Sequence, residues 1–359
     1  MKAILMLEDK RSFKGEAVGA GGEAIGEVIL NTAVVGYQEM LTDPANAGKI
    51  LVLTYPLIGN YGVAPKFNQS KKTWASGLVI KEKSRIYSNW QAKASLDDFI
   101  REEKLVTISE VDTRTLAVHL RQKGEMPGII STQCFDAKEL LAKLEDFRKK
   151  KAKSLLPKIS VARPKQLGAK KAKYKIAILD LGIQNSIIRQ LQALGLSLWL
   201  LPYNTTSQEI LCLKLSGLII SGGPELDIGL KDVANNIRPL IRKLPILGIS
   251  TGYQVLALAL GAKLHKMKLG HRGVNYPIQN PAAYKGEITA QNHSCAVDAD
   301  SLRKIEGIKI TALNLNDRTV EEIESKKLKV MGVQYYPASP GFNEVNNIFK
   351  KFLKLIQKE

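Results

Sequence analysis

The sequence is poor in cysteine and has no long apolar run. Its three cysteines, Cys134, Cys212 and Cys295, are far apart and form no C-x-x-C pair, so the sequence supports neither a disulfide framework nor a structural zinc site. We expect small, buried side chains there. No apolar stretch is long enough to cross a bilayer, and no basic segment with an apolar core and a cleavage site follows Met1. We therefore expect a cytoplasmic protein that does not enter membranes.

Acidic residues are also scarce relative to basic ones. The net charge is +19, and residues 148–173 carry eleven Lys or Arg and no acid, so the rest of the chain has a net charge of only +8. This segment contains no aromatic residue, whereas proteins that bind single-stranded nucleic acid combine cations with aromatic stacking groups. We interpret residues 148–173 as a basic linker between two domains and expect no nucleic-acid partner.

The chain of 359 residues is long enough for two domains, and the segments on either side of the linker differ in pattern. Residues 174–359 alternate buried-strand runs such as "KIAILD" and "GLII" with helical segments, which predicts a doubly wound, parallel α/β domain. Residues 1–147 are rich in glycine and β-branched residues, which predicts a mixed α/β, β-rich domain. Residues 1–147 have no metal-ligand cluster and no phosphate-binding loop, so we expect neither a metal nor a cofactor there.

A tight turn in residues 245–262, "PILGISTGYQVLALALGA", is the strongest chemical motif. Its G-x-S-x-G core is typical of an elbow between a strand and a helix, where a serine hydroxyl is exposed near helix N-terminal amides. Ser250 is the candidate nucleophile. A serine hydroxyl is a weak nucleophile that depends on a neighbouring base, so the function depends on whether such a base exists.

Five segments together resemble one family along nearly the whole chain. They are "GEVILNTAVVGYQEMLTDP", "LTYPLIGNYG", "VDTRTLAVHLRQKG", "GAKLHKMKLGHRGVNYPI" and "ITAQNHSCAVD". In this order they resemble the small, glutamine amidotransferase subunit of carbamoyl-phosphate synthetase, including an N-terminal domain that other class I amidotransferases lack. The resemblance implies a C-terminal class I amidotransferase-like domain.

The resemblance also implies a partner and a pathway. In that family the small subunit hydrolyses glutamine and passes ammonia to a large subunit, which uses ATP, Mg and bicarbonate to make carbamoyl phosphate for arginine and pyrimidine synthesis. The implied partner is therefore a large subunit, in a heterodimer or a higher oligomer, docked by the N-terminal domain. ATP and Mg are implied only for that partner, and no cofactor or metal is implied for this chain.

The catalytic positions depart from the family pattern. The family has cysteine where this chain has Ser250, and its motif Gln-Gly-His-Pro-Glu-Ala-Ser-Pro-Gly contains the base and its orienting glutamate. Residues 334–341 read "QYYPASPG", so Tyr336 replaces the histidine and the glutamate is missing. With an ordinary pKa near 10, tyrosine needs a large shift to act as a base at neutral pH.

No histidine in the sequence is an obvious substitute base. His119 lies in the other predicted domain, and His265 and His271 follow the elbow helix in a basic stretch. His293 matches a histidine of the family's "QNH" motif, and we interpret it as a surface or packing residue rather than a relocated base.

The positions matching the family's glutamine pocket are altered as well. A serine of the family falls at Ala45, or at Ala47 in a gapped alignment, and Gly223-Pro224-Glu225 replaces a Gly-Pro-Gly turn. Glu225 adds a carboxylate and a Cβ where the backbone approaches substrate closely. Three further positions of this pocket differ from the family: Thr251 (family Leu), Ser294 (family Gly) and Cys295 (family Phe). Gly223, Gln254 and Asn292 match the family.

Three functions remain open on these residues. The first is a small subunit that supports its large subunit but has lost glutamine hydrolysis, and in which glutamine binding is doubtful. The second is a serine-based glutaminase or other hydrolase that uses Ser250 with an unrecognised base. The third is a non-enzymatic binding or regulatory protein. Glutamine turnover separates the second from the first, and association with a large subunit separates the first from the third.

Overall fold

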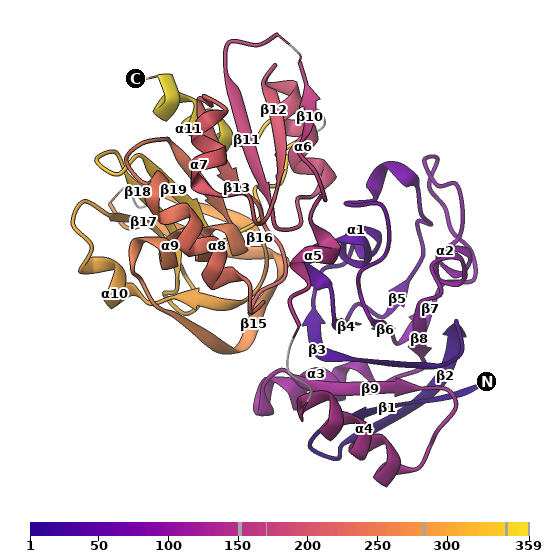
Figure 1. The fold of residues 1–359 in the computed structure, drawn as a ribbon. Coiled ribbons are helices and arrows are strands. Elements are labelled where there is room, and N and C mark those ends of the chain that lie inside the picture. Colours follow the sequence, from indigo (N-terminus) through magenta and orange to yellow (C-terminus); the bar gives the residue numbers. More distant parts are fainter. Residues whose placement is uncertain (150–152, 170, 283–284, 342–343, 358–359) are drawn as a thin grey trace. The chain divides into compact units, whose positions relative to one another are not determined.

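The computed structural model describes residues 1–149, 153–169, 171–282, 285–341 and 344–357. The chain forms two compact units, and Figure 1 labels most of their helices and strands. The N-terminal unit consists of Met1–Ala152 and Lys268–Arg272, and the C-terminal unit consists of Lys153–Met267 and Gly273–Glu359. The long strand β15 (Leu264–Asn280) therefore contributes residues to both units.

The N-terminal unit is a closed barrel with the strand order β1-β2-β8-β6-β4-β3-β9. Its strands are β1 (Lys2–Leu7), β2 (Ser12–Gly19), β3 (Glu23–Asn31), β4 (Lys49–Leu53), β6 (Gly77–Val79), β8 (Val106–Ser109) and β9 (Met126–Ser131), with the separate pair β5 (Leu57–Ile58) and β7 (Glu82–Lys83). Its helices are α1 (Tyr37–Thr42), η1 (Pro44–Asn46), η2 (Pro65–Phe67), α2 (Leu96–Glu102), α3 (Thr113–Lys123) and α4 (Ala137–Lys149).

Strand β4 illustrates why this half of the sequence forms a barrel. Ile50 and Val52 pack into one buried cluster with the apolar side chains of β1 and β3, whereas Leu51 and Leu53 pack into a second cluster with α1 and α2. Successive side chains point to opposite faces of a strand, so an all-apolar run is buried on both sides. The prediction of a β-rich mixed domain is confirmed.

The C-terminal unit is built on a ten-stranded sheet with the order β10-β12-β11-β13-β14-β19-β18-β17-β15-β16. Its other strands are β10 (Lys165–Gly168), β11 (Lys175–Asp180), β12 (Ser197–Pro202), β13 (Gly217–Ile220), β14 (Ile246–Ile249), β16 (Lys285–Val297), β17 (Lys309–Asn314), β18 (Val320–Ser325) and β19 (Val330–Val333). Its helices are α5 (Leu156–Ile159), α6 (Asn185–Ala193), α7 (Ser207–Cys212), α8 (Leu230–Ile237), η3 (Arg238–Leu240), α9 (Thr251–Leu260), α10 (Ala299–Arg303) and α11 (Asn347–Gln357).

Helices cover both faces of the central strands. Strands β12, β11, β13, β14 and β19 pair in parallel. On β11, Ile176 and Ile178 join the buried cluster of α6 and α11, whereas Ala177 and Leu179 join that of α8 and α9. This is the predicted doubly wound arrangement, which is confirmed. Strands β10, β15, β17 and β18 are antiparallel additions that the alternating pattern did not predict.

The basic segment 148–173, expected to be a linker, contains ordered elements. Leu156 of α5 is fully buried, and β10 pairs with β12 at the edge of the sheet. Lysine is common on edge strands because its charge opposes pairing with another chain, so a basic composition is compatible with a strand there. Residues 150–152 and 170 of this segment lie outside the described residues.

The expectation that all three cysteines are buried is wrong for Cys212. This residue is exposed at the end of helix α7, while Cys134 is half-buried and Cys295 is buried in β16. In the described part of the chain, no helix combines the length and the apolar character needed to span a bilayer.

Candidate functional site

Ser250 lies between β14 and α9, at the elbow that the motif predicts. Its backbone has φ 52° and ψ −116°, a conformation that L-residues rarely adopt. Its amide donates to Val333 O at 2.7 Å, which continues the pairing of β14 with β19 up to the turn. The elbow therefore presents the Ser250 side chain at the carboxyl end of a central parallel strand, where doubly wound domains hold their ligands.

Two glycines allow this elbow to form. A Cβ on Gly252 would lie 2.0 Å from Ile220 O, and a Cβ on Gly248 would lie 2.7 Å from Gly252 O. Both distances are too short for any side chain, so the spacing G-x-S-x-G is a packing requirement for bringing α9 close to β13 and β14. It would be required whether or not Ser250 reacts.

The turn after β13 lies against the elbow. Thr251 Oγ1 donates to Gly223 O at 2.7 Å, and a Cβ on Gly222 would lie 3.7 Å from Ser250 Cβ. Gly223 itself approaches Leu181 O so closely that an added Cβ would be 2.0 Å away. Thr251, Gly223 and Ser250 thus lie close together, after the ends of β13 and β14.

Glu225 extends the same turn toward β16. Its Oε2 accepts a hydrogen bond from the Ser294 amide at 2.5 Å, and its Oε1 accepts one from the Cys295 amide at 3.2 Å. Gln254 Nε2 also donates to Glu225 Oε1, at 2.7 Å. The predicted pocket residues Glu225, Gln254, Ser294 and Cys295 are therefore direct neighbours.

Gln254 is held by more than the Glu225 carboxylate. It is 1% exposed on α9, and its Nε2 lies 3.2 Å from Cys295 O and 3.3 Å from Gln334 Oε1. Sequence reasoning missed Gln334, although it precedes the altered "YYP" segment. Its position next to that segment was the only available signal.

Tyr336 is hydrogen bonded through both its backbone and its side chain. Its amide donates to Ala290 O at 2.8 Å, and its hydroxyl is hydrogen bonded to Ser186 Oγ in the first turn of α6. Among the described residues, no hydrogen bond joins the Tyr336 hydroxyl to Ser250. Sequence reasoning missed Ser186, because nothing in its local pattern indicates a partner 150 positions away.

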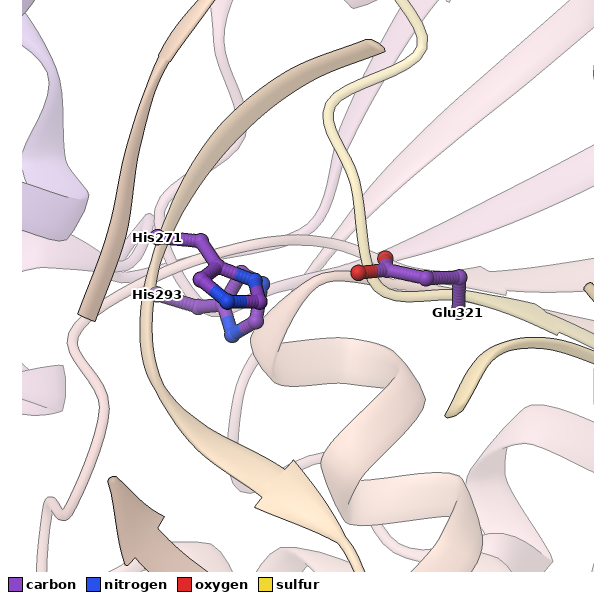
Figure 2. A group of neighbouring side chains, drawn as sticks. All are labelled: His271, His293 and Glu321. Atoms are coloured by element: carbon purple, nitrogen blue, oxygen red, sulfur yellow. The ribbon is translucent and has the colours of Figure 1, made fainter. Parts of the chain in front are cut away.

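His293 is a buried residue of β16 with Glu321 of β18 close by, as Figure 2 shows. His293 Nδ1 lies 3.0 Å from Cys295 O, and the Glu321 carboxylate accepts hydrogen bonds from Gln291 and Asn314, each at 2.9 Å. The packing interpretation of His293 agrees with these contacts. The third side chain labelled in Figure 2, His271, belongs to the segment Lys268–Arg272 of the N-terminal unit.

Two ionisable groups next to the site have shifted pKa values. Burial raises the pKa of Asp180 at the end of β11, and the amides of Ile183, Val161 and Gly182, which donate to its carboxylate, oppose that rise. Burial, followed by the charge of Glu322, raises the pKa of Tyr335 well above its ordinary value. Tyr335 therefore stays protonated and donates to Glu322 at 2.5 Å.

The remaining predicted positions are Asn292, Ala45 and Ala47. Asn292 is half-buried in β16. Ala45 and Ala47 are buried in the N-terminal unit, within and directly after η1, and the Ala45 amide donates to Asp43 Oδ1 at 2.9 Å.

Comparison with known proteins gives one consistent result. Residues 5–130 match the family model "Carbamoyl-phosphate synthase small chain, CPSase domain", and residues 177–355 match "Glutamine amidotransferase class-I". Proteins called carbamoyl phosphate synthase small chain are 40% identical in Chlorobaculum tepidum, 39% in Syntrophotalea carbinolica and 39% in Akkermansia muciniphila. These alignments cover 99%, 100% and 99% of this chain and 98% of each relative. The chain therefore belongs to the carbamoyl phosphate synthase small chain family.

Proposed function

We propose that this chain supports a carbamoyl-phosphate synthetase large subunit but does not hydrolyse glutamine. The large subunit, with ATP and Mg, makes carbamoyl phosphate from free ammonia, and the N-terminal unit provides the docking surface. Membership of the family supports association with a large subunit. The hydrogen bond between the hydroxyls of Tyr336 and Ser186 supports the loss of glutamine hydrolysis.

The contact of Tyr336 with Ser186 is the observation that carries this proposal. Glutamine hydrolysis needs a nucleophile that attacks the side-chain amide carbon and a base that first takes the nucleophile's proton. By the family resemblance Tyr336 replaces the base, and its hydroxyl is hydrogen bonded to the Ser186 hydroxyl. Tyrosine is a poor replacement for a histidine base, because the reference pKa of tyrosine is about 10 and that of histidine is about 6.5, so we expect no efficient proton transfer from Ser250.

The test is ammonia release from glutamine, measured on the chain alone and in complex with the cognate large subunit. We expect no release above background from the wild type, Ser250→Ala or Ser250→Cys, because a nucleophile without its base recovers little activity. A combined variant with Ser250→Cys, Tyr336→His, Glu225→Gly and a glutamate inserted after Pro337 should gain activity. Since a general base contributes about 10²–10⁴-fold, it should exceed Ser250→Cys by a factor in that range.

One observation favours the second candidate, a serine-based hydrolase. Ser250 has the strained backbone of a nucleophile elbow, and such strain is frequent at active sites. Robust ammonia release by the wild type that disappears in Ser250→Ala would establish this function and refute the first.

A further inference from the structure

Three hydrogen-bond donors from two distant segments converge on the Glu225 carboxylate. The donors are the backbone amides of Ser294 and Cys295 and the side-chain amide of Gln254, at 2.5, 3.2 and 2.7 Å. Ser294, Cys295 and Gln254 are each 1% exposed. Buried N–H groups that point at one carboxylate are how proteins bind a carboxylate ligand, because such charge-assisted bonds are short and strong.

We propose that Glu225 is an internal ligand that fills a carboxylate-binding site, so that free carboxylates are excluded from it. The site belongs to β16 and α9, whereas the carboxylate that fills it belongs to the turn after β13. If the Glu225 side chain were absent, this site would bind the carboxylate of a small molecule, such as the α-carboxylate of an amino acid. This inference extends the proposed function, because it gives the lack of glutamine hydrolysis a second cause, at the binding step.

The turn is held in place independently of the Glu225 carboxylate. On one side Thr251 Oγ1 donates to Gly223 O. On the other side Asp227 accepts hydrogen bonds from Ser154 Oγ and the amides of Leu155 and Gly229, at 2.6, 2.6 and 2.8 Å. Removing the Glu225 side chain should therefore vacate the site without releasing the turn.

Backbone strain indicates that the turn has a stability cost. Leu226 has φ +59° and is 54% exposed, so burial of its side chain does not compensate for the unfavourable conformation.

The Glu225 carboxylate has a high effective concentration at the site. A flexible tether already gives an internal group an effective concentration in the millimolar range, and a turn held at both ends gives a higher one. A weakly bound free carboxylate cannot compete with Glu225 under these conditions.

The test follows the backbone amide resonances of Ser294 and Cys295 by NMR while acetate is added, with acetamide as the uncharged control. In the wild type we expect no saturable shift. In Glu225→Gly both amides should shift saturably with acetate and not with acetamide, with an apparent affinity at least about tenfold above the wild type. Glu225→Gln keeps one oxygen acceptor and should give an intermediate response.

A matched control and a second variant distinguish occupation of the site by Glu225 from unrelated effects of a substitution. Glu306→Gly makes the same substitution at a side chain that is 85% exposed, and it should behave like the wild type. Glu225→Ala repeats the test with less backbone freedom, in case Glu225→Gly does not fold. Equal acetate binding by wild type and Glu225→Gly, or no binding by either folded variant, would refute the proposal. Because this is a binding measurement, either outcome leaves the ammonia-release test of the proposed function unaffected.

Discussion

Ser250 combines a strained backbone with a side chain that has no base among its described hydrogen-bond partners. Backbone strain of this type costs on the order of 1–3 kcal/mol, and glycine relieves it because glycine has no Cβ. If hydrolysis has been lost, the strain no longer serves a reaction. The fold retains it because the two flanking glycines and the pairing of β14 with β19 fix the turn.

The variant Ser250→Gly should therefore be more stable than the variant Ser250→Ala. Both variants remove the hydroxyl, but only alanine keeps a Cβ in the unfavourable conformation. We expect the free energy of unfolding of Ser250→Gly to exceed that of Ser250→Ala by about 1 kcal/mol, since the greater entropy of unfolded glycine offsets part of the gain. Urea denaturation of both variants measures the difference. A Ser250→Gly variant less stable than Ser250→Ala would show that the turn is not strained.

Single residues show where sequence reasoning is limited. The motif indicated Ser250 as the elbow residue, because the glycine spacing is a local packing requirement. The alignment also indicated Glu225 as a residue that changes the pocket. It could not indicate that the partners of Glu225 are the amides of Ser294 and Cys295, because backbone donors have no sequence signature and lie about 70 positions away.

At the scale of elements, the close approach of α9 to β13 shapes the site. Gly252→Ala places a Cβ 2.0 Å from a backbone oxygen of Ile220, which cannot move without disturbing the central sheet. Gly261 ends the same helix with φ +96° and has nothing within 4 Å of an added Cβ, so alanine there meets only conformational strain.

These two glycines allow a graded prediction. We expect Gly252→Ala to lower the free energy of unfolding by at least about 3 kcal/mol, as severe overpacking does. Gly261→Ala should lower it by about 1 kcal/mol. Gly286→Ala in β16, where the nearest atom would be 3.6 Å away, serves as the control and should change it by less than about 0.5 kcal/mol. Thermal and urea denaturation measure all three, and a Gly252→Ala variant as stable as the control would contradict the close packing.

The central strands were predictable because they are buried on both faces and read as short apolar runs. The antiparallel strands β15 and β17 were not, because their exposed and buried residues do not alternate regularly and their neighbours depend on pairing across the sheet. Strand β10 was missed for another reason. Its sequence, KQLG, has little β-propensity, and pairing with β12 determines its structure.

At the scale of the whole molecule, the proposed function depends on association with a second subunit. The segment "NTAVVGYQEMLTDP", one of those that carry the family resemblance, leaves Val34 and Val35 52% and 56% exposed between β3 and α1. Single exposed apolar residues are common, but two adjacent ones in a segment that matches the family suggest a contact with the partner. We infer that this pair forms part of the docking surface for the large subunit.

The double variant Val34→Asp, Val35→Asp should therefore weaken association with the cognate large subunit by at least about tenfold, because two charges would be buried in an apolar contact. Ile288→Asp alters a residue of the C-terminal unit that is 67% exposed, and it should leave the affinity for the large subunit unchanged.

The same preparations test the role of Val34 and Val35 in carbamoyl phosphate synthesis. The wild-type complex should make carbamoyl phosphate from ammonium but not from glutamine, and the double variant should lose the part of that activity that depends on the small subunit. If the purified wild-type subunits do not associate at micromolar concentration, the chain is not a supporting subunit, and the binding-protein function becomes the better explanation of its fold.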